Sequence, residues 1–388
     1  MNKKGSFLKG NIRQYVMVIA LVVVIILFQF LTKGVLLKPL NISNLISQNA
    51  YILILAVGML LCILTGGNVD LSVGSVAGFV GAISATMMLK MDIPVFPTIV
   101  VSLILGFLIG CWQGFWIAYV GVPAFIATLA GMLIFRGLTL VVLKGTSLAP
   151  LPAEYTFMAS GFLPEIGKMG NLNILAIAVG IIASILYILK ELNDRKNKRK
   201  YGFEVSSLKT FVPQVLGILL IINAFTYSLA SYKGIPMVLV IVIVLVLIYS
   251  FITMKTIPGR HIYAYGGNMK AAQLSGVNTK KVMFWVYANM GLLAALAGVI
   301  FTGRLNSATP KSGVNFELDA IAACFIGGAS TSGGVGTVVG AMVGGLLMGV
   351  LNNGMSIMGI SIDWQQAIKG FVLLGAVAFD VYSKSKSK

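Results

Sequence analysis

The chain has 388 residues, of which 58% are hydrophobic and only 10% are charged. An ordinary soluble domain carries about 25% charged residues, so this composition excludes a soluble protein and predicts one that is solvated by lipid. The formal net charge is +18, but the basic residues lie between apolar stretches and form no nucleic-acid-binding face. We therefore expect membrane lipid, with its anionic headgroups, and no nucleic acid among the partners.

Catalytic and metal-binding patterns are missing from the sequence. It has one histidine, His261, and three cysteines, Cys62, Cys111 and Cys324, each inside an apolar stretch. Their spacing provides neither a disulfide framework nor a metal site. The chain also lacks a phosphate-binding loop and a Ser-His-Asp set. The sequence therefore predicts no enzyme activity, no metal and no cofactor on this chain.

A membrane-spanning helix needs about 20 mostly apolar residues, and the chain offers a series of candidates. They are residues 15–31, 48–64, 71–89, 97–119, 123–143, 172–189, 211–230, 236–254, 282–303, 318–326, 336–351 and 364–382. The first has no cleavage site after it, so we expect it to be retained. Segment 318–326 is too short to span unless its neighbours join it. Glycine-rich breaks form either turns or re-entrant segments, so we expect an all-α polytopic membrane protein with about ten to twelve transmembrane helices.

The placement of the basic residues predicts the topology. They cluster in alternate connections, whereas residues 144–171 carry few, which is the positive-inside pattern. Both termini are therefore expected in the cytoplasm. The predicted parts are a basic cytoplasmic N-terminus (1–14), a single transmembrane domain (15–382) with cytoplasmic loops at 190–209 and 255–281, and a basic cytoplasmic tail (383–388).

Two glycine-rich breaks interrupt the apolar segments in similar ways. The first break contains Gly66, Gly67, Asn68, Asp70 and Ser72, and the second contains Gly327, Gly328 and Ser330. Each follows a short apolar run and precedes an apolar helix. Such a pair favours an internal duplication, which in transporters places broken helices along the pathway. Chance recurrence in a chain with 44 glycines is the alternative.

Glycines also recur at every fourth position in two apolar segments. The two sets are Gly106, Gly110 and Gly114, and Gly336, Gly340 and Gly344. Each set lies on one face of a helix, where small residues let two helix backbones approach closely. We expect these faces to serve helix packing.

Few ionisable residues lie within the apolar segments, and such residues are functional candidates. Arg136 lies well inside its segment and needs a partner, a water cavity or a route to the interface. Asp70, Glu317 and Asp319 lie at helix ends, where a carboxylate also offsets the amide dipoles. Lys369 is expected to snorkel to the interface. Because deep carboxylates are scarce, coupling of transport to an ion gradient is disfavoured.

The loop 255–281 contains the signature of a short helix. Asn268 is a good N-cap residue and Gly276 a good terminator, which predicts a helix of about two turns outside the membrane. So short a helix has little stability alone. A contact with a soluble partner explains it, and an ordinary connecting loop is the alternative.

Several motifs, taken in order, resemble the permease subunits of ribose/xylose/galactose-type ABC sugar importers. They occupy residues 65–74, 123–131, 259–278, 293–298, 317–323, 327–336 and 351–354. The resemblance covers roughly residues 45–150 and 258–380. Residues 172–254 depart from the shorter ribose-type members and look like the extra pair of spans of longer xylose-type permeases.

The resemblance implies a multi-pass permease of the bacterial plasma membrane. Two permease copies, alike or different, would pair with two cytoplasmic ATP-binding subunits, which hold the ATP and Mg²⁺. An extracytoplasmic binding protein would deliver a monosaccharide, a pentose or a hexose. The ATPase contact would carry over onto Gly266, Gly267, Asn268, Ala271, Ala272, Leu274 and Gly276. The candidate pathway residues are Gly66, Gly67, Asn68, Asp70, Ser72, Arg136, Asp319, Gly327 and Gly328.

Two other kinds of transport protein stay open on the residues alone. An ion-coupled secondary carrier for a small polar solute would need no partner ATPase. A passive channel or a structural membrane protein would allow only downhill flux, or none.

Overall fold

The computed structural model describes residues 4–170, 172–203, 205 and 207–385. These residues form a helical bundle, with one two-stranded hairpin made by β1 (Lys168–Met169) and β2 (Leu172–Asn173). Residues 1–3 of the predicted basic N-terminus and 386–388 of the predicted tail lie outside the described residues. The all-α prediction is confirmed.

The helices follow the predicted apolar segments. They are α1 (Lys4–Leu31), α2 (Pro39–Leu64), α3 (Val73–Lys90), α4 (Val95–Phe115), α5 (Ala124–Leu143), α6 (Ala153–Ser160), α7 (Ile174–Lys200), α8 (Leu208–Ala230), α9 (Met237–Lys255), α10 (Ile257–Gly267), α11 (Met269–Leu274), α12 (Thr279–Leu305), α13 (Phe316–Ile326), α14 (Val338–Ile357) and α15 (Ile362–Ser385). A π-helical turn, Trp116–Val120, extends α4. Each predicted segment lies largely or wholly within one of these helices.

Nine helices within the described residues are long and apolar enough to cross a membrane: α2, α3, α4 with its π-helical turn, α5, α7, α8, α9, α12 and α14. The stretch Met17–Leu31 of α1 is a shorter apolar helix. Helix α13 has 11 residues and ends at the second glycine break. At 1.5 Å per residue it is about 16 Å long, roughly half the bilayer core. This confirms that segment 318–326 does not span by itself.

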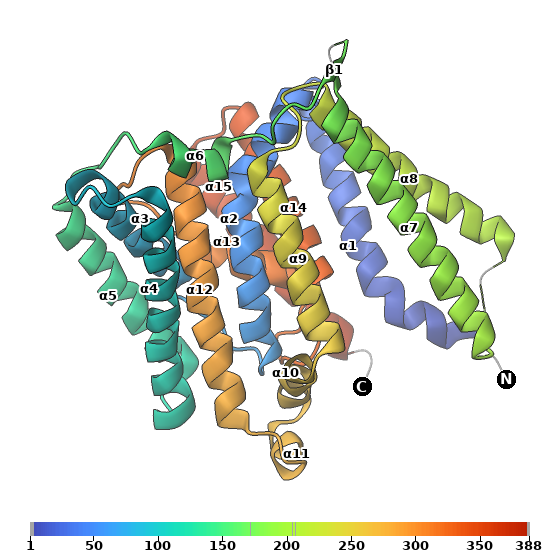
Figure 1. Ribbon diagram of the computed structural model, residues 1–388. Coiled ribbons are helices and arrows are strands. Elements are labelled where there is room, and N and C mark those ends of the chain that lie inside the picture. The colour runs from blue at the N-terminus through green and yellow to red at the C-terminus, as the bar shows by residue number, and fades with distance from the viewer. Residues whose placement is uncertain (1–3, 171, 204, 206, 386–388) are drawn as a thin grey trace.

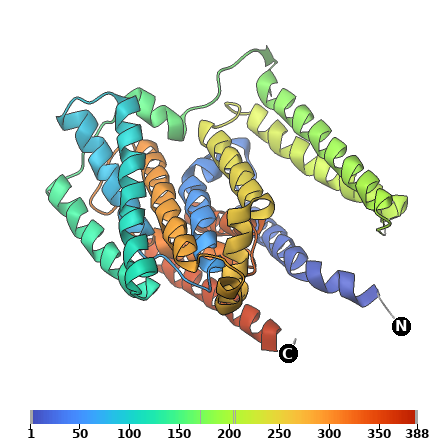
Figure 2. The ribbon, with the colours of Figure 1, turned by 60° about the horizontal axis from the view of Figure 1, so that its bottom comes forward.

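Helices α2 and α12 form the centre of the bundle (Figure 1). In the most apolar window of α2, 83% of the residues are buried inside the protein, whereas none are buried in that of α8. The hairpin of α7 and α8 stands at the edge of the bundle in both views (Figure 2). The apolar side chains of α7 and α8 are exposed, which is typical of helices that face lipid. The N-terminal end of α1 and the C-terminal end of α15 point toward the side that carries α10 and α11 (Figure 1).

Gly106, Gly110 and Gly114 pack α4 against α12, as predicted, and Gly340 and Gly344 pack α14 against the end of α13. The third predicted glycine of the second set, Gly336, instead precedes α14, which begins at Val338, so it is not part of that helix face. A Cβ atom on Gly106 would lie 2.6 Å from the carbonyl oxygen of Gly291 on α12, and one on Gly110 would lie 2.4 Å from that of Tyr287. On α14, a Cβ atom on Gly344 would lie 2.0 Å from the carbonyl oxygen of Ala323. Only hydrogen side chains fit at these positions, so the glycines set the distance between the helices.

Two connections contain more helix than hydropathy predicts. Helix α7 continues through the basic residues to Lys200, so most of the predicted loop 190–209 is the end of this helix. Lysine, arginine and glutamate are good helix formers, and cations stabilise a helix C-terminus. The connection 144–171 holds α6, which begins directly after Pro152.

We expect Gly110→Ala to lower the thermal stability of the purified protein, because the added methyl group overpacks the contact with α12 at a cost of about 1–3 kcal/mol. Gly217→Ala is the matched control, since a Cβ atom there meets nothing within 4 Å on the exposed α8. It should leave stability unchanged or raise it by up to about 1 kcal/mol. Melting curves in the same detergent compare the two variants, and equal melting temperatures would contradict the packing role of Gly110.

Candidate functional site

A pair of short helices, α10 and α11, leaves the bundle between α9 and α12 (Figure 1). Asn268 begins α11, and its side-chain oxygen accepts a hydrogen bond from the N–H of Ala271 at 3.0 Å. The chain then turns at Gly276, where φ is +86°. These features confirm the predicted cap and terminator. Helix α10 was not predicted; its signals are the N-cap Thr256 and Pro258 in the first turn.

The residues of α11 divide into two faces. Ala272 is only 5% exposed and holds the helix against its own loop, whereas Leu274 is 90% exposed. Asn268, Ala271 and Gly276 are also exposed. Leu274 is therefore an apolar side chain outside the spans that no other part of the described chain covers. Of the predicted contact residues within α11, Ala272 therefore lies on the buried face and Leu274 on the exposed face.

Three chain segments meet through their backbones at the inner end of α10. The N–H of Gly334, in the second break, donates a hydrogen bond to the carbonyl oxygen of Leu64, the last residue of α2, at 3.0 Å. A Cβ atom on Gly266 would lie 1.8 Å from that same oxygen and 2.4 Å from the nitrogen of Gly334. We call this contact of residues 64–67, 266–267 and 331–334 the glycine junction.

The two glycine breaks contact each other within the glycine junction. A Cβ atom on Gly67 would lie 2.0 Å from the carbonyl oxygen of Thr331, and one on Gly333 would lie 2.5 Å from the Cα atom of Gly66. The hydroxyl of Tyr263 on α10 also donates to the carbonyl oxygen of Gly336 at 2.7 Å. Helix α10 is thus bonded to the second break and packed against the first.

The predicted pair Gly327 and Gly328 lies outside this junction. A Cβ atom on Gly327 would meet the carbonyl oxygen of Gly340 on α14 at 2.3 Å, and Gly328 faces Met17 of α1. The second break touches the first through residues 331–334 instead. The sequence shows two similar glycine pairs, but it does not show which glycines of each break face each other.

A buried chain of hydrogen bonds holds the first break. Asp70 is 1% exposed and accepts hydrogen bonds from the backbone N–H of Ser72 at 2.8 Å and from its hydroxyl at 2.6 Å. The Ser72 oxygen accepts in turn from the side-chain amide of Gln113 on α4 at 2.7 Å. Asn68 donates to the carbonyl oxygen of Thr65 at 2.6 Å. These bonds satisfy the polar groups of the break and orient it against α4.

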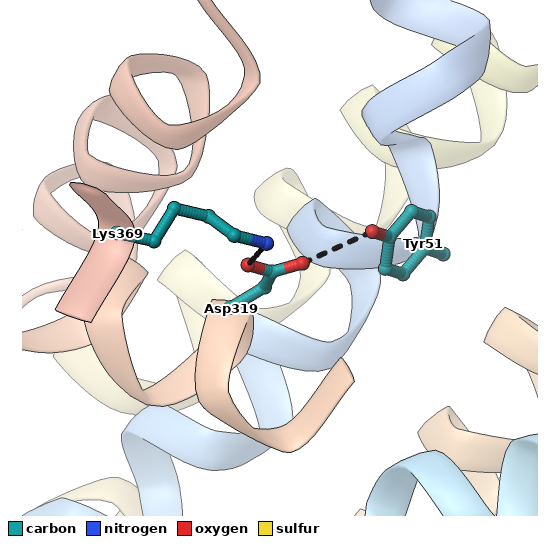
Figure 3. A network of polar contacts seen from close by, with 3 residues as sticks. All are labelled: Tyr51, Asp319 and Lys369. Carbon is teal, nitrogen blue, oxygen red and sulfur yellow. Dashed lines mark hydrogen bonds and ion pairs between the residues drawn. The ribbon is translucent and has the colours of Figure 1, made fainter. Parts of the chain in front are cut away.

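Asp319 belongs to a second polar group, which links three helices (Figure 3). Its carboxylate pairs with the ammonium group of Lys369 on α15 at 2.8 Å and accepts from the hydroxyl of Tyr51 on α2 at 3.1 Å. The expectation that Lys369 snorkels is wrong, because a buried carboxylate lies within reach and neutralises it. Tyr51 was not predicted as a site residue, because the sequence does not show that its hydroxyl lies beside Asp319.

Arg136 lies close enough to Glu317 for their opposite charges to attract. The carboxylates of Asp70 and Asp319 also lie near enough to repel the carboxylate of Glu317. Oε2 of Glu317 and Nη2 of Arg136 are buried, and neither has a hydrogen-bond partner among the described residues. A Cβ atom on Gly74 would lie 2.5 Å from Oε2 of Glu317, so glycine leaves room for this carboxylate. Oε2 of Glu317 and Nη2 of Arg136 are therefore buried polar groups that the described residues leave unsatisfied, and ionisable groups of this kind within a membrane are functional candidates.

Among the residues that the structure describes, no three His, Cys, Asp or Glu side chains gather closely enough to hold a metal ion. The polar groups described around the two breaks instead consist of carboxylates, hydroxyls, amides and the basic side chains of Arg136 and Lys369. Side chains of this kind form hydrogen bonds with neutral hydroxyl-rich solutes and with one another.

Replacing Lys369 with methionine should destabilise the protein by about 3 kcal/mol, because it leaves the Asp319 carboxylate buried without its cation. Tyr51→Phe should cost roughly half as much, since it removes one hydrogen bond to a charged group. The double variant Asp319→Asn with Lys369→Met removes both charges and should recover most of the loss. Denaturant unfolding in detergent measures all three, and a double variant no more stable than Lys369→Met would contradict the pairing.

Gly266→Ala should disrupt the glycine junction, because its methyl carbon has no space beside the oxygen of Leu64. The adjacent Gly267→Ala is a matched control, since a Cβ atom there meets nothing within 4 Å. We expect the first variant to lower stability by about 1–3 kcal/mol or more and to abolish transport. The second should keep the stability of the wild type, since its methyl group has space; melting curves measure stability, and solute uptake measures transport. If Gly266→Ala were as stable as Gly267→Ala, the close packing at the glycine junction would be contradicted.

The sequence comparisons agree with this architecture. Residues 41–377 match the family described as "Branched-chain amino acid transport system / permease component". The xylose transport system permease protein XylH of Haemophilus influenzae is 40% identical over 377 residues, covering 97% of this chain and 98% of the relative. XylH of Escherichia coli K12 is 38% identical over 378 residues, covering 97% and 94%. The ribose import permease protein RbsC of Haemophilus influenzae is 36% identical over 346 residues, covering 89% and 86%. No solved structure matches.

The family description mentions amino acids, whereas these relatives are named for the pentose sugars xylose and ribose. The resemblance inferred from the sequence motifs is therefore confirmed. With its apolar helices, the chain is a multi-pass protein of the bacterial plasma membrane. It belongs to this family of transport permeases and is similar within it to the ribose- and xylose-type sugar permeases.

Proposed function

We propose that the chain is the transmembrane subunit of an ATP-binding-cassette importer that carries a monosaccharide, driven by ATP hydrolysis on a separate subunit. The observation that supports this most directly is the connection from Leu274, through α10, to both glycine breaks. The chain has no nucleotide-binding motif of its own. Helix α11 carries an uncovered leucine outside the bundle, and the adjoining α10 contacts both glycine breaks inside it. Such a pair of helices suits the transmission of movement from a soluble ATPase.

The proposed cargo is a pentose, with xylose favoured. Two xylose permeases align with 97% of this chain, whereas the ribose permease aligns with 89%. The α7–α8 hairpin matches the extra pair of spans that we expected for the longer xylose-type permeases. Arg136 and Glu317 each have a buried polar atom without a partner among the described residues, and these are the kinds of hydrogen-bonding groups that a sugar hydroxyl needs.

In the proposed cycle the glycine junction is the closed gate at the cytoplasmic end of the pathway. ATP binding would move the partner ATPases, and Leu274 would transmit this movement to α10. Because α10 is bonded to the second break and packed on the first, a shift of α10 changes how the two breaks fit together. Opening at this end would release the sugar, and opening at the other end would admit it from a binding protein outside. A second permease copy would complete the membrane part.

An ion-coupled carrier is the second candidate, and the buried pair of Asp319 and Lys369 is the observation that favours it. Ion-coupled carriers use carboxylates within the membrane to bind and release the ion. Here, however, Asp319 is already paired with a lysine and a tyrosine, which holds its charge in place. A carrier of this kind would transport without ATP and would stop when a protonophore or sodium removal collapsed the gradient.

Co-purification in mild detergent tests the proposal. We expect an ATP-binding subunit to remain bound to the wild-type chain in stoichiometric amount, as identified by mass spectrometry. Leu274→Glu should reduce this bound subunit at least ten-fold and abolish ATP-driven uptake in proteoliposomes. Gln273→Glu adds the same charge at the neighbouring exposed position and serves as the control.

A homo-oligomer without an ATP-binding subunit would contradict the proposal, as would uptake that continues without ATP. Unchanged binding in the Leu274→Glu variant would contradict the role of α11 alone, and the family assignment would stand.

A further inference from the structure

A groove of about 900 Å³ opens between α9, α10 and the first turns of α12. The α12 side of the groove is lined by Asn278, Lys281, Val282, Trp285, Val286 and Asn289. These positions recur at intervals of three and four residues and so lie on one helix face. The opposite wall contains Tyr249, Ile252 and Thr256, at the end of α9. The groove takes no part in the glycine junction or in the polar groups around the breaks.

The groove changes from charged to apolar along its length. His261 and Lys281 line it near the ends of the two spans, where α9 stops at Lys255 and α12 starts at Thr279. Trp285 follows one turn further in and is 58% exposed. Tryptophans are enriched where lipid headgroups meet acyl chains. Ile252, Val282 and Val286 line the part inside the spans.

Charge complementarity identifies the kind of molecule that fits the mouth. Residues 255–281 include five lysines and arginines and no aspartate or glutamate. The whole stretch from residue 205 to residue 316 also lacks acidic residues. None of the residues that line the groove is acidic either, so an anion at the mouth meets Lys281 and the imidazole of His261 without a carboxylate among the lining side chains.

The depth of the groove selects among anionic occupants. Asn289 lies two turns of α12 beyond Lys281, inside the span, and its side-chain Nδ2 is buried without a hydrogen-bond partner among the described residues. An acidic protein surface would reach the mouth only. A phospholipid supplies a phosphate for the mouth, ester oxygens that accept hydrogen bonds and a hydrocarbon chain for the apolar walls.

We propose that this groove is a binding site for one anionic phospholipid, whose phosphate lies at Lys281 and His261 and whose acyl chain lies between α9 and α12. Because the groove wall includes the N-terminal part of α10, a lipid seated there contacts the element that leads to the glycine junction. The inference uses the proposed function only to assign the groove to the cytoplasmic leaflet.

Native mass spectrometry of the full chain in detergent tests this site, with phosphatidylglycerol and phosphatidylethanolamine of identical acyl chains as probes. We expect wild type to retain phosphatidylglycerol more strongly. Lys281→Gln should weaken this retention about five-fold, the effect of one basic residue near an anionic headgroup. Lys280→Gln removes the same charge one position away, outside the groove lining, and should behave as wild type. Melting curves confirm that both variants are folded.

A groove-filling variant separates acyl binding from charge attraction. Val282→Phe keeps Lys281 and should weaken retention of both lipids, because its ring occupies the space of the chain. Equal losses in Lys281→Gln and Lys280→Gln would overturn the proposal in favour of diffuse attraction, and so would equal retention of the two lipids by wild type. A photo-crosslinking residue in place of Trp285 should capture lipid. Capture of a second copy or of an ATPase subunit instead of lipid would also overturn the lipid site. None of these outcomes would change the co-purification result, which tests the proposed transport function separately.

Discussion

The structure depends on a backbone contact that leaves no room for a Cβ atom. At the glycine junction the end of α2, the end of α10 and the loop after α13 approach so closely that only glycine fits at Gly67, Gly266 and Gly333. Contacts of this kind are set by hard-core repulsion and one hydrogen bond, so they hold the segments at a defined distance but do not bury large side chains. The glycine junction therefore joins the two breaks to α10 mainly through backbone atoms.

Hydropathy and local helix signals predicted most of the helices. Each expected apolar segment became helix, and the cap at Asn268 and the turn at Gly276 were found where expected, because these features depend on short-range chemistry. The continuation of α7 to Lys200 was missed because a helix does not have to end where the membrane does. Helix α10 was missed because its residues are too mixed in polarity to show a clear apolar face.

The tertiary pairings were harder to predict, since they join residues that are far apart in the sequence. Asp319 and Asp70 were recognised as candidates from their rarity in apolar segments, but their partners were not. Lys369 seemed close enough to its helix end to reach water, yet the nearby carboxylate offers a better environment. Which glycines of the two breaks face each other likewise depends on how α2 and α13 sit side by side, and no single-sequence pattern contains that information.

The link between Asp319 and Lys369 has a consequence for the order of synthesis. Helix α13 is too short to cross the bilayer alone and carries two acidic residues in its first turn. The cation that neutralises Asp319 lies 50 residues later, on the final helix. Until α15 emerges from the ribosome, this part of the nascent chain has a carboxylate that the lipid cannot accept. Helix α15 is therefore the element that allows α13 to reach its final position, and a truncation that deletes α15 would also leave Asp319 without its cation.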